Sequence, residues 1–353
     1  MSQSAGGGAE LTATMHAMLL TGHGGPERLE YRTDVPVPRP APGEVLIRVG
    51  AAGINNTDLA TRTGWYAAGD AAGGGWTGAA LDFPRIQGAD VCGRIADVGP
   101  GVDPARIGER VLVQPCLRSL RRDGRDVWLG SERDGGFAQF VAVPAADAWP
   151  VDSPWTDADL ATFPCAYATA ENLLTRAGVA AGERVLVTGA SGGVGSAAVQ
   201  LAARRGAEVT ALAGRDKLAA CAGLGAARLI AREDGISGTL AKDSLDAVID
   251  VTGGDGFAAM LDALRPRGRY AVSGAIAGPL VTLDLRTLYL KDLTLFGCTG
   301  QDDGVFAALI GYIERREIRP LVARVYALRD LAQAQEAFAA KRHVGKLVAI
   351  PPP

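Results

Sequence analysis

The stretch RVLVTGASGGVGSAAVQLAARRG, residues 184–206, decides the fold class. It begins as an apolar strand, turns through Gly189, Gly192, Gly193 and Gly195, and continues as an amphipathic helix. Glycines at such a turn allow a tight bend and leave backbone N–H groups at the positive helix end open to a phosphate. A further strand that ends about 20 residues later completes the pattern, which favours a dinucleotide site.

The rest of the chain divides around this stretch. Residues 163–300 alternate apolar strands with amphipathic helices, which predicts an α/β unit with a Rossmann-type, doubly wound parallel sheet. Residues 14–162 contain short alternating runs broken by Gly, Pro and Asp, which predict a strand-rich, partly open barrel. Residues 301–353 have no parallel sheet left to extend, so we expect them to return to the first unit. Residues 1–13 look like a flexible tail.

The composition of the chain limits the kinds of partner that it is expected to bind. The chain has 353 residues, 48% of them apolar, and a net charge of -3, which gives no general reason to bind nucleic acid or a membrane. No signal-peptide pattern or membrane span is evident, so we expect a cytoplasmic location. The five cysteines lack the close pairs of a zinc site or redox dithiol and suit buried thiols in a reducing compartment. A small molecule is the expected partner.

The second strand of the nucleotide pattern, in EVTALAGRDKL, predicts the type of nucleotide. An NAD site normally has a carboxylate at the end of this strand, whereas here the strand leads to Arg215 and Lys217. These cations suit the 2'-phosphate of NADPH, and Arg232 after the third strand adds another positive charge. Asp216 lies one residue too late for the ribose role but keeps NADH open as an alternative.

Two rival enzyme classes share parts of the pattern. GASGG also fits the G-x-S-x-G elbow of hydrolases, for which Ser191, Asp250 and His343 would supply the required order of serine, acid and histidine. The elbow does not require Gly195, and His343 lies in the basic stretch AKRHVGK, which is typical of a solvated surface. The short-chain reductases need Tyr-x-x-x-Lys, and no tyrosine here has a lysine four residues on.

The chain resembles the medium-chain dehydrogenase/reductase superfamily. The resemblance is carried by the glycine loop, the strand-rich first half and the motifs GINNTDL, FPRIQGADVCGRIADVG, YLKDLTLFG and GKLVAI. Within it, the chain is most similar to the zinc-free quinone oxidoreductase-like branch, from about residue 14 to 350. The resemblance implies a GroES-like catalytic domain formed by residues 14–162 and 301–353, and an NADP(H)-binding domain formed by residues 163–300. It also implies a homodimer, with LTLFGC as an edge strand.

The same resemblance bears on metal binding. Zinc alcohol dehydrogenases of the superfamily carry cysteine and histidine where this chain has Asn55 and Asn56, and Gly-His-Glu at residues 88–90, which here read GAD. Only Cys165 matches a catalytic zinc ligand, and catalytic zinc normally needs three. The cysteines of the structural zinc lobe are replaced by the arginine-rich residues 116–136, either a solvated loop or an acid-binding surface. We therefore expect no metal.

Hydride transfer without a metal favours an acceptor that delocalises the arriving charge, such as a quinone or an enone. The resemblance places Asn55 and Tyr66 beside the nicotinamide as catalytic residues: the amide would orient the ring or acceptor oxygen, and the phenol would donate a proton. The alternatives are a loop-stabilising amide, an aromatic pocket wall and, for Asp58, a helix cap. Residues 67–82 are either a flap over the substrate or a surface loop.

The cofactor contacts implied by the resemblance are spread over several motifs. They are Thr169, Ser191, Gly192, Gly193, Val194, Gly195, Thr252, Gly253, Ser273, Gly274 and Lys346, in addition to the cations after the second and third strands. The sequence thus predicts an NADPH-dependent, metal-free quinone or enone reductase. A carbonyl or alcohol oxidoreductase and an NADPH-binding protein without catalytic role stay open.

Overall fold

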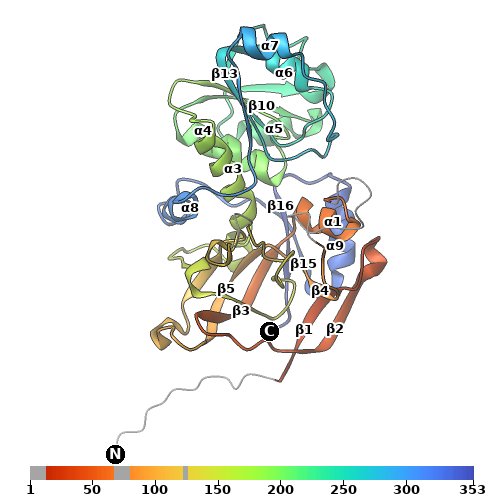
Figure 1. Ribbon diagram of the computed structural model, residues 1–353, viewed down its shortest axis with the longest axis vertical. Helices are drawn as coiled ribbons and strands as arrows, with labels where there is room; N and C mark the ends of the chain where they lie inside the picture. The colour runs from red at the N-terminus through yellow and green to blue at the C-terminus, as the bar shows by residue number, and fades with distance from the viewer. Residues whose placement is uncertain (1–12, 67–79, 122–125) are drawn as a thin grey trace, which may run out of the picture.

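The computed structural model describes residues 13–66, 80–121 and 126–353 (Figure 1). The expected tail and most of the expected flap lie outside the described residues. Two lobes are visible in Figure 1, one of helices around a central sheet and one rich in strands. This arrangement confirms the α/β class with a Rossmann sheet and a second, strand-rich domain.

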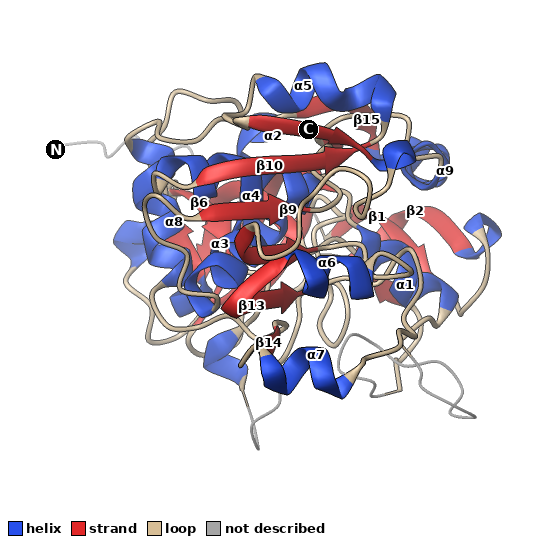
Figure 2. Ribbon diagram, turned by 90° about the horizontal axis from the view of Figure 1, so that it is seen from above, coloured by secondary structure: helices blue, strands red, loops and turns tan. Residues whose placement is uncertain are grey.

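The first lobe is built on a six-stranded parallel sheet in the order β11-β10-β9-β12-β13-β14. The chain order reverses between β9 and β12, and ligands of such sheets bind beyond the carboxyl ends of the strands at that point. Figure 2 shows β9 and β10 side by side. The strands are β9 (Arg184–Val187), β10 (Glu208–Ala213), β11 (Arg228–Ala231), β12 (Leu245–Asp250), β13 (Leu264–Val272) and β14 (Thr294–Gly297).

The helices of this lobe follow the strands, as the sequence predicts. They are α4 (Gly193–Arg204), α5 (Leu218–Ala222), α6 (Phe257–Ala263) and α7 (Leu285–Leu290). Helix α4 buries the side of its amphipathic surface that faces the sheet, including Ala197, Ala198 and Leu201. Small residues on that side let the helix pack closely, which holds its N-terminus just beyond the end of β9.

The second lobe contains a seven-stranded sheet with the path β15-β16-β3-β5-β6-β8, in which β7 pairs with β3, and a three-stranded sheet β2-β1-β4. The C-terminal β16 pairs antiparallel with β3, so the last strand of the chain joins a sheet formed by its first half (Figure 1). The strands are β1 (Thr14–Leu20), β2 (Leu29–Pro36), β3 (Glu44–Gly53), β4 (Arg85–Ile86), β5 (Asp90–Val98), β6 (Arg110–Val113), β7 (Phe140–Pro144), β8 (Ala148–Pro150), β15 (Val322–Ala327) and β16 (Lys346–Ile350).

Helix α3 (Pro164–Arg176) joins the lobes. Ten of its 13 residues are buried, and it packs against α4 and against α8 (Val305–Glu314). One apolar core includes residues of both lobes, so the two lobes pack against each other. The remaining helices are α1 (Asn56–Thr63), α2 (Asp157–Leu160) and α9 (Leu331–Ala339). Among the described residues, no helix is both long and apolar enough to cross a membrane.

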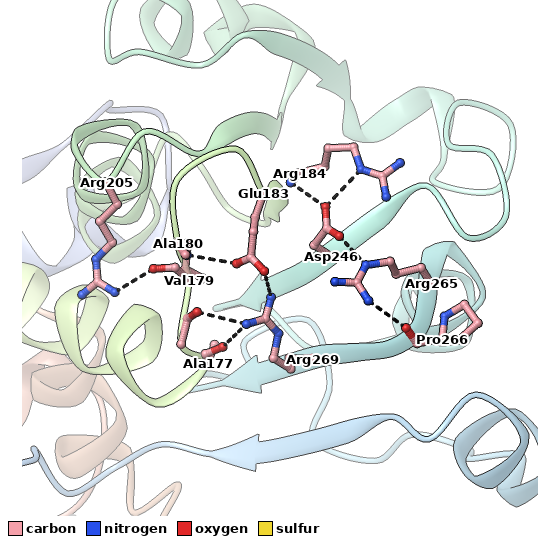
Figure 3. A network of polar contacts seen from close by, with 11 residues as sticks. Ala177, Val179, Ala180, Glu183, Arg184, Arg205, Asp246, Arg265, Pro266 and Arg269 are labelled. Atoms are coloured by element: carbon pink, nitrogen blue, oxygen red, sulfur yellow. Dashed lines mark hydrogen bonds and ion pairs between the residues drawn. The ribbon is translucent and has the colours of Figure 1, made fainter.

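The amino end of the six-stranded sheet is held by ion pairs (Figure 3). Asp246 accepts hydrogen bonds from the backbone N–H and Nε of Arg184, at 2.8 and 3.0 Å, and is paired with Arg265. Arg269 donates to Glu183 at 2.5 Å. Burial alone would raise the pKa of Asp246, but the hydrogen bonds from Arg265 and Arg184 lower it to about 2. Asp246 and Glu183 at this end therefore each have an arginine partner.

Candidate active site

The glycine loop has the geometry that an anion site requires. Gly189 has a φ of +57°, and a Cβ at Gly195 would lie 2.1 Å from the carbonyl oxygen of Gly189, so neither position accepts a side chain. Gly192 is extended and precedes the first turn of α4. The N–H groups of Gly193, Val194 and Gly195 lie in that turn, where no intrahelical carbonyl can reach them. These groups can bind a phosphate.

The expected contacts beyond β12 and β13 lie together at the carboxyl edge of the sheet. Asp250 accepts from the backbone N–H groups of Thr252 and Gly253 at 2.9 and 3.1 Å, and its carbonyl accepts from Ser273 N at 3.1 Å. A Cβ at Gly274 would lie 2.6 Å from a main-chain oxygen, which explains the glycine. Through these hydrogen bonds, buried Asp250 fixes the backbone just beyond the ends of β12 and β13.

The hydrolase alternative is wrong because its acid has other partners. Within the described residues, the Asp250 carboxylate accepts from Thr188 Oγ1 at 2.6 Å and Tyr270 OH at 2.5 Å, and no histidine donates to it. Burial and nearby lysines lower the pKa of His343 to about 4, so its ring is neutral at pH 7. Ser191 contributes its carbonyl, which accepts from the backbone of the C-terminal segment.

Asn55 and Lys346 meet in the cleft, together with the acid at the start of β5. Lys346 Nζ donates to Asn55 Oδ1 at 2.5 Å and to Asp90 Oδ2 at 2.7 Å, and Asn55 Nδ2 donates to Asp90 Oδ2 at 2.8 Å. The backbone N–H of Cys165 donates to Asp90 Oδ1 at 2.5 Å. The side chains of Lys346 and Asp90 are 3% and 0% exposed. This group of residues is a buried, closed hydrogen-bond cluster that joins β16, β5, α3 and the loop before α1.

Two residues of α3 line up beside this cluster. Cys165 is buried, and burial and then Asp90 raise the pKa of its thiol well above the ordinary value. Thr169, one turn further along, interacts with the thiol and lowers that pKa in part. Among the described residues, no three His, Cys, Asp or Glu side chains are placed to hold a metal ion.

Asp58 takes part in capping α1, as expected, but as the partner of the N-cap residue in a capping box and not as the N-cap itself. The N-cap of α1 is Asn55, and Asp58 lies inside the first turn, where its Oδ2 accepts from Asn55 N at 2.7 Å. Burial raises the pKa of Asp58 to about 7, although Asn55 N and Lys346 pull it down. The fold therefore keeps a second carboxyl, whose ionisation burial opposes, beside the cluster.

Tyr66 follows α1, after Gly64 ends that helix in the left-handed conformation. Burial raises the pKa of the Tyr66 phenol to about 12, and the Thr57 hydroxyl lowers it slightly. The ring of Trp65 packs edge-on at 5.4 Å between centroids. The phenol stays protonated at pH 7 and keeps a proton to donate.

The three expected cations near β10 and β11 have different surroundings. Exposed Arg215 is paired with Asp234, and Arg232 Nη2 lies 3.3 Å from Glu233 Oε1. Lys217 instead donates to a main-chain carbonyl after α9, and no carboxylate of the described chain lies within ion-pair distance of it. Of the three, Lys217 has the charge most available to a ligand.

Sequence reasoning missed one basic residue of the cleft. Lys341 Nζ donates to Asn56 Oδ1 at 2.6 Å, and its carbonyl accepts from Lys217. Gly345 N donates to Ser191 O at 3.0 Å, so the segment that carries Lys341 lies against the glycine loop. From its composition, AKRHVGK was interpreted as a solvated basic stretch. The signal that could have revealed it is the tandem amide in GINNTDL, which offers one acceptor to each of two lysines.

The arginine-rich residues 116–136 are only in part a solvated loop, because Cys116, Leu117 and Trp128 are buried. Arg118 is paired with Asp303, and Arg121 Nε lies 3.1 Å from Asp126 Oδ1. These side chains line a polar recess of about 530 Å³, in which their charges are already matched. Residues 122–125 lie outside the described part of the chain.

Comparison with known proteins agrees with this architecture. Residues 41–153 match the family model for the alcohol dehydrogenase GroES-like domain, and residues 193–315 match the model described as zinc-binding dehydrogenase. A candidate alcohol dehydrogenase from Sinorhizobium meliloti 1021 superposes with a TM-score of 0.92 and 49% identity, over 98% of each chain.

Curated relatives extend over nearly the whole chain. An acryloyl-coenzyme A reductase from Metallosphaera sedula is 30% identical, over 95% of this chain and 99% of its own. A quinone oxidoreductase from Rattus norvegicus is 28% identical, over 91% and 93%. With both domain models matched in order and a full-length relative at 30% identity, the chain belongs to the medium-chain dehydrogenase/reductase superfamily and is an oxidoreductase of that superfamily.

Proposed function

We propose that the protein is an NADPH-dependent, metal-free oxidoreductase of the quinone oxidoreductase-like branch that reduces a quinone or an α,β-unsaturated carbonyl. The observation that carries this proposal is the buried cluster of Lys346, Asn55 and Asp90. Within it, Asn55 Oδ1 accepts from Lys346, and both oxygens of the Asp90 carboxylate accept hydrogen bonds, at distances of 2.5 to 2.8 Å. Catalytic zinc normally takes three protein ligands, and among the described residues no three His, Cys, Asp or Glu side chains lie where they could hold a metal ion. These residues do not suit a catalytic zinc ion.

The residues present suit a nicotinamide dinucleotide. The bare backbone of the glycine loop and the free N–H groups of α4 would hold the diphosphate. The ends of β12 and β13 would flank the ring, and Thr169 would lie near the ribose. Lys217 and Arg215 favour the phosphorylated form, since β10 ends at Ala213 without a carboxylate of its own; Glu233 of the neighbouring turn accepts from Arg215 N at 3.1 Å. When bound, the nicotinamide supplies the hydride.

The acceptor is inferred from the donors that line the cleft. Lys346 uses two of its three N–H bonds within the described residues, on Asn55 and Asp90. Such donors steady the partial charge of a conjugated oxygen, which is already spread over several atoms. Burial raises the pKa of Tyr66 to about 12, so the phenol stays protonated at pH 7 and can donate a hydrogen bond or a proton to the acceptor oxygen. The relatives named for acryloyl-CoA and quinone reduction agree in kind with such acceptors.

The test is NADPH oxidation with 1,4-benzoquinone, an enone, an enoyl thioester and a simple aldehyde. We expect turnover with one of the conjugated acceptors and a Tyr66→Phe variant slower by about 10²-fold in kcat. The affinity of Tyr66→Phe for NADPH should stay unchanged. Turnover that requires added zinc, or that chelators abolish, would contradict the proposal. NADPH binding without turnover of any acceptor would favour a non-catalytic role.

A second candidate is an NADP(H)-dependent carbonyl or alcohol oxidoreductase. It is favoured by the candidate alcohol dehydrogenase at 49% identity. Faster reduction of a simple aldehyde than of each conjugated acceptor would select this alternative.

We also propose a homodimer located in the cytoplasm. Strand β14 is a sheet edge, since only β13 pairs with it in the described chain, and exposed apolar residues lie before it at Leu280, Leu285, Tyr289 and Leu290. Such an edge and patch are usually covered. We expect Leu290→Glu to shift the sedimentation coefficient from dimer to monomer. The five cysteines are free and buried, which suits a reducing compartment.

A further inference from the structure

One buried carboxylate holds the carboxyl ends of three neighbouring strands of the six-stranded sheet. Asp250, at the end of β12, is 0% exposed, and its Oδ1 accepts from Thr188 Oγ1, just beyond β9, at 2.6 Å. Its Oδ2 accepts from the hydroxyl of Tyr270, on β13, at 2.5 Å. Along its own strand, Oδ1 accepts from Thr252 N, Thr252 Oγ1 and Gly253 N at 2.9, 3.0 and 3.1 Å. The carboxylate therefore ties β9, β12 and β13 together at the point where the strand order reverses.

The two oxygens of Asp250 both act as acceptors, which few side chains could reproduce. An asparagine at this position would place an NH2 group, which donates, where one of the two oxygens now accepts. Burying a carboxyl group among neutral partners is also costly, and the partners of Asp250 in the described chain are hydroxyl and backbone N–H groups. A costly group at the cleft indicates a functional requirement beyond stability.

The three strand ends lead into loops that pack directly against one another. A Cβ at Gly189, the residue after Thr188, would lie 2.9 Å from Thr252 Cγ2, so the glycine loop touches the loop after β12. A Cβ at Gly254 would lie 2.7 Å from Ala277 O, so the loop after β12 also touches the loop after β13. Ala277 N donates to Thr252 O at 2.8 Å. Because these contacts are close and involve main-chain atoms, a displacement of one loop displaces its neighbour.

The other half of the sheet ends without such a tie. Strand β10 ends at Ala213 and β11 at Ala231, whose methyl groups accept no hydrogen bond. That half is expected to bind the 2'-phosphate end of the nucleotide, where contacts serve binding alone. The half with Asp250 is expected to flank the nicotinamide ring. Reacting atoms must approach to about 3–3.5 Å, and a displacement of about 1 Å can lower a rate by about 10²-fold. Precise backbone placement is therefore required at the ring and not at the phosphate.

We propose that Asp250, together with Tyr270, is a positioning residue for hydride transfer: the pair fixes the loops after β12 and β13 against the glycine loop, and so fixes the distance from the ring to the acceptor. Neither side chain has to touch the cofactor. They act through Thr252, Gly253 and Ser273, whose N–H donates to Asp250 O at 3.1 Å. The inference rests on the proposed function, in which the acceptor gains a hydride and a proton.

The first test removes one hydroxyl group. Tyr270→Phe keeps the ring, which packs edge-on against Phe257 at 5.2 Å between centroids, but Asp250 loses its donor from β13. We expect kcat with the best conjugated acceptor to fall by about 10-fold, while the Kd for NADPH and the KM for the acceptor change by less than about 3-fold. With NADPH deuterated at the transferred position, the isotope effect on kcat should be at least as large as in wild type. An unchanged kcat, or a smaller isotope effect, would overturn the proposal.

Tyr167→Phe is the matched control. Tyr167 is buried like Tyr270, and its hydroxyl donates to a main-chain oxygen, Arg319 O, at 2.6 Å. Each variant loses one buried hydroxyl that donates a hydrogen bond, so the midpoints of urea denaturation should fall by similar amounts. Tyr167→Phe should nevertheless keep kcat within about 2-fold of wild type. An equal fall of kcat in the two variants would mean a general effect of stability and would overturn the positioning role.

A second measurement needs no cofactor. Hydrogen exchange of the free protein, followed by mass spectrometry, should be faster in residues 251–256 and 273–278 of Tyr270→Phe than in wild type, and unchanged there in Tyr167→Phe. Asp250→Asn should show a larger increase in the same residues and a larger fall in kcat, because one of its two positions then donates. If Asp250→Asn does not fold, Tyr270→Phe still decides. Exchange in these residues that is the same in Tyr270→Phe and wild type would overturn the proposal, because the loops would not depend on the tie.

The inference and the proposed function fail in different ways. A wild-type protein that oxidises NADPH with none of the acceptors would refute the proposed function. Turnover and hydrogen exchange that are the same in Tyr270→Phe and wild type would refute this inference alone. A Tyr270→Phe variant that loses NADPH affinity by more than about 10-fold and keeps kcat would show that the tie serves binding, and would overturn its role in hydride transfer.

Discussion

The two ends of the six-stranded sheet differ in how their charged side chains are paired. At the amino end, Asp246 binds two arginines and Glu183 binds another (Figure 3). At the carboxyl end, which faces the cleft, Lys217 and Lys341 have no carboxylate partner in the described chain. On the ligand side Arg215 and Arg232 are paired with carboxylates, so only some of its cations are left unmatched.

The carboxyl groups of the two regions show the same contrast. Asp246 has its pKa lowered to about 2 by arginine hydrogen bonds, whereas burial raises the pKa of Asp58 beside the cleft to about 7. A lowered pKa means that ionisation stabilises the fold, and a raised pKa means that ionisation opposes it. The cleft therefore contains groups whose burial costs stability, which is typical of functional sites.

The largest expected effect is at the buried pair of the cleft. Lys346→Met leaves the Asp90 carboxylate buried without its cation, so we expect the free energy of unfolding to fall by about 3–5 kcal/mol in urea denaturation. The double variant Lys346→Met with Asp90→Asn should recover part of this loss because the charge is gone. A loss below about 1 kcal/mol would show that the cluster is open to water.

The next effect is a pH dependence caused by Asp58. Between about pH 4 and 7 the native state binds more protons at Asp58 than the unfolded state, so its contribution to stability declines as the pH rises. Asp58→Asn should remove this decline, which we expect to amount to a few kcal/mol because a tenfold change in proton affinity corresponds to about 1.4 kcal/mol. The measurement is urea denaturation of both proteins from pH 4 to 8. Parallel stability curves would show that Asp58 titrates normally.

At the amino end of the six-stranded sheet, stability depends on pH with the opposite sign. Asp246→Asn should cost about 1–3 kcal/mol at pH 7 through its arginine hydrogen bonds. The contribution of Asp246 is present above about pH 4 and is lost as the pH falls through about 2, so the two proteins should converge in acid. NADPH affinity, measured in parallel, should not change. A loss of affinity would mean that the amino end of the sheet influences the cleft.

The smallest expected effect is on NADPH affinity, when a cation that has a carboxylate partner is removed instead of one that has none. Arg215→Met removes a charge that Asp234 already accompanies, so NADPH affinity should fall by only about 2- to 5-fold. Lys217→Met removes an unaccompanied charge and should cost more, at equal ionic strength. The reverse order would show that Arg215 leaves its aspartate and binds the 2'-phosphate.

How far the sequence could predict this site depends on distance along the chain. The glycine loop was predictable because its strand, turn and helix are contiguous and each glycine answers a local backbone requirement. The role of Asp58 was only partly predicted, because the cap turned out to be the residue three positions earlier. Lys341 was missed because a basic surface stretch and a cleft stretch have the same local composition.

The sequence alone determined the two-domain α/β architecture, since hydrophobic periodicity and glycine placement act over a few residues and are written in order. Only the tertiary structure decided which polar groups share a site. Asn55 and Asn56 meet their lysines across 291 and 285 residues because β16 returns to β3, and no local pattern records that pairing. Whether each lysine is neutralised or left charged depends on that contact, and hence on the fold as a whole.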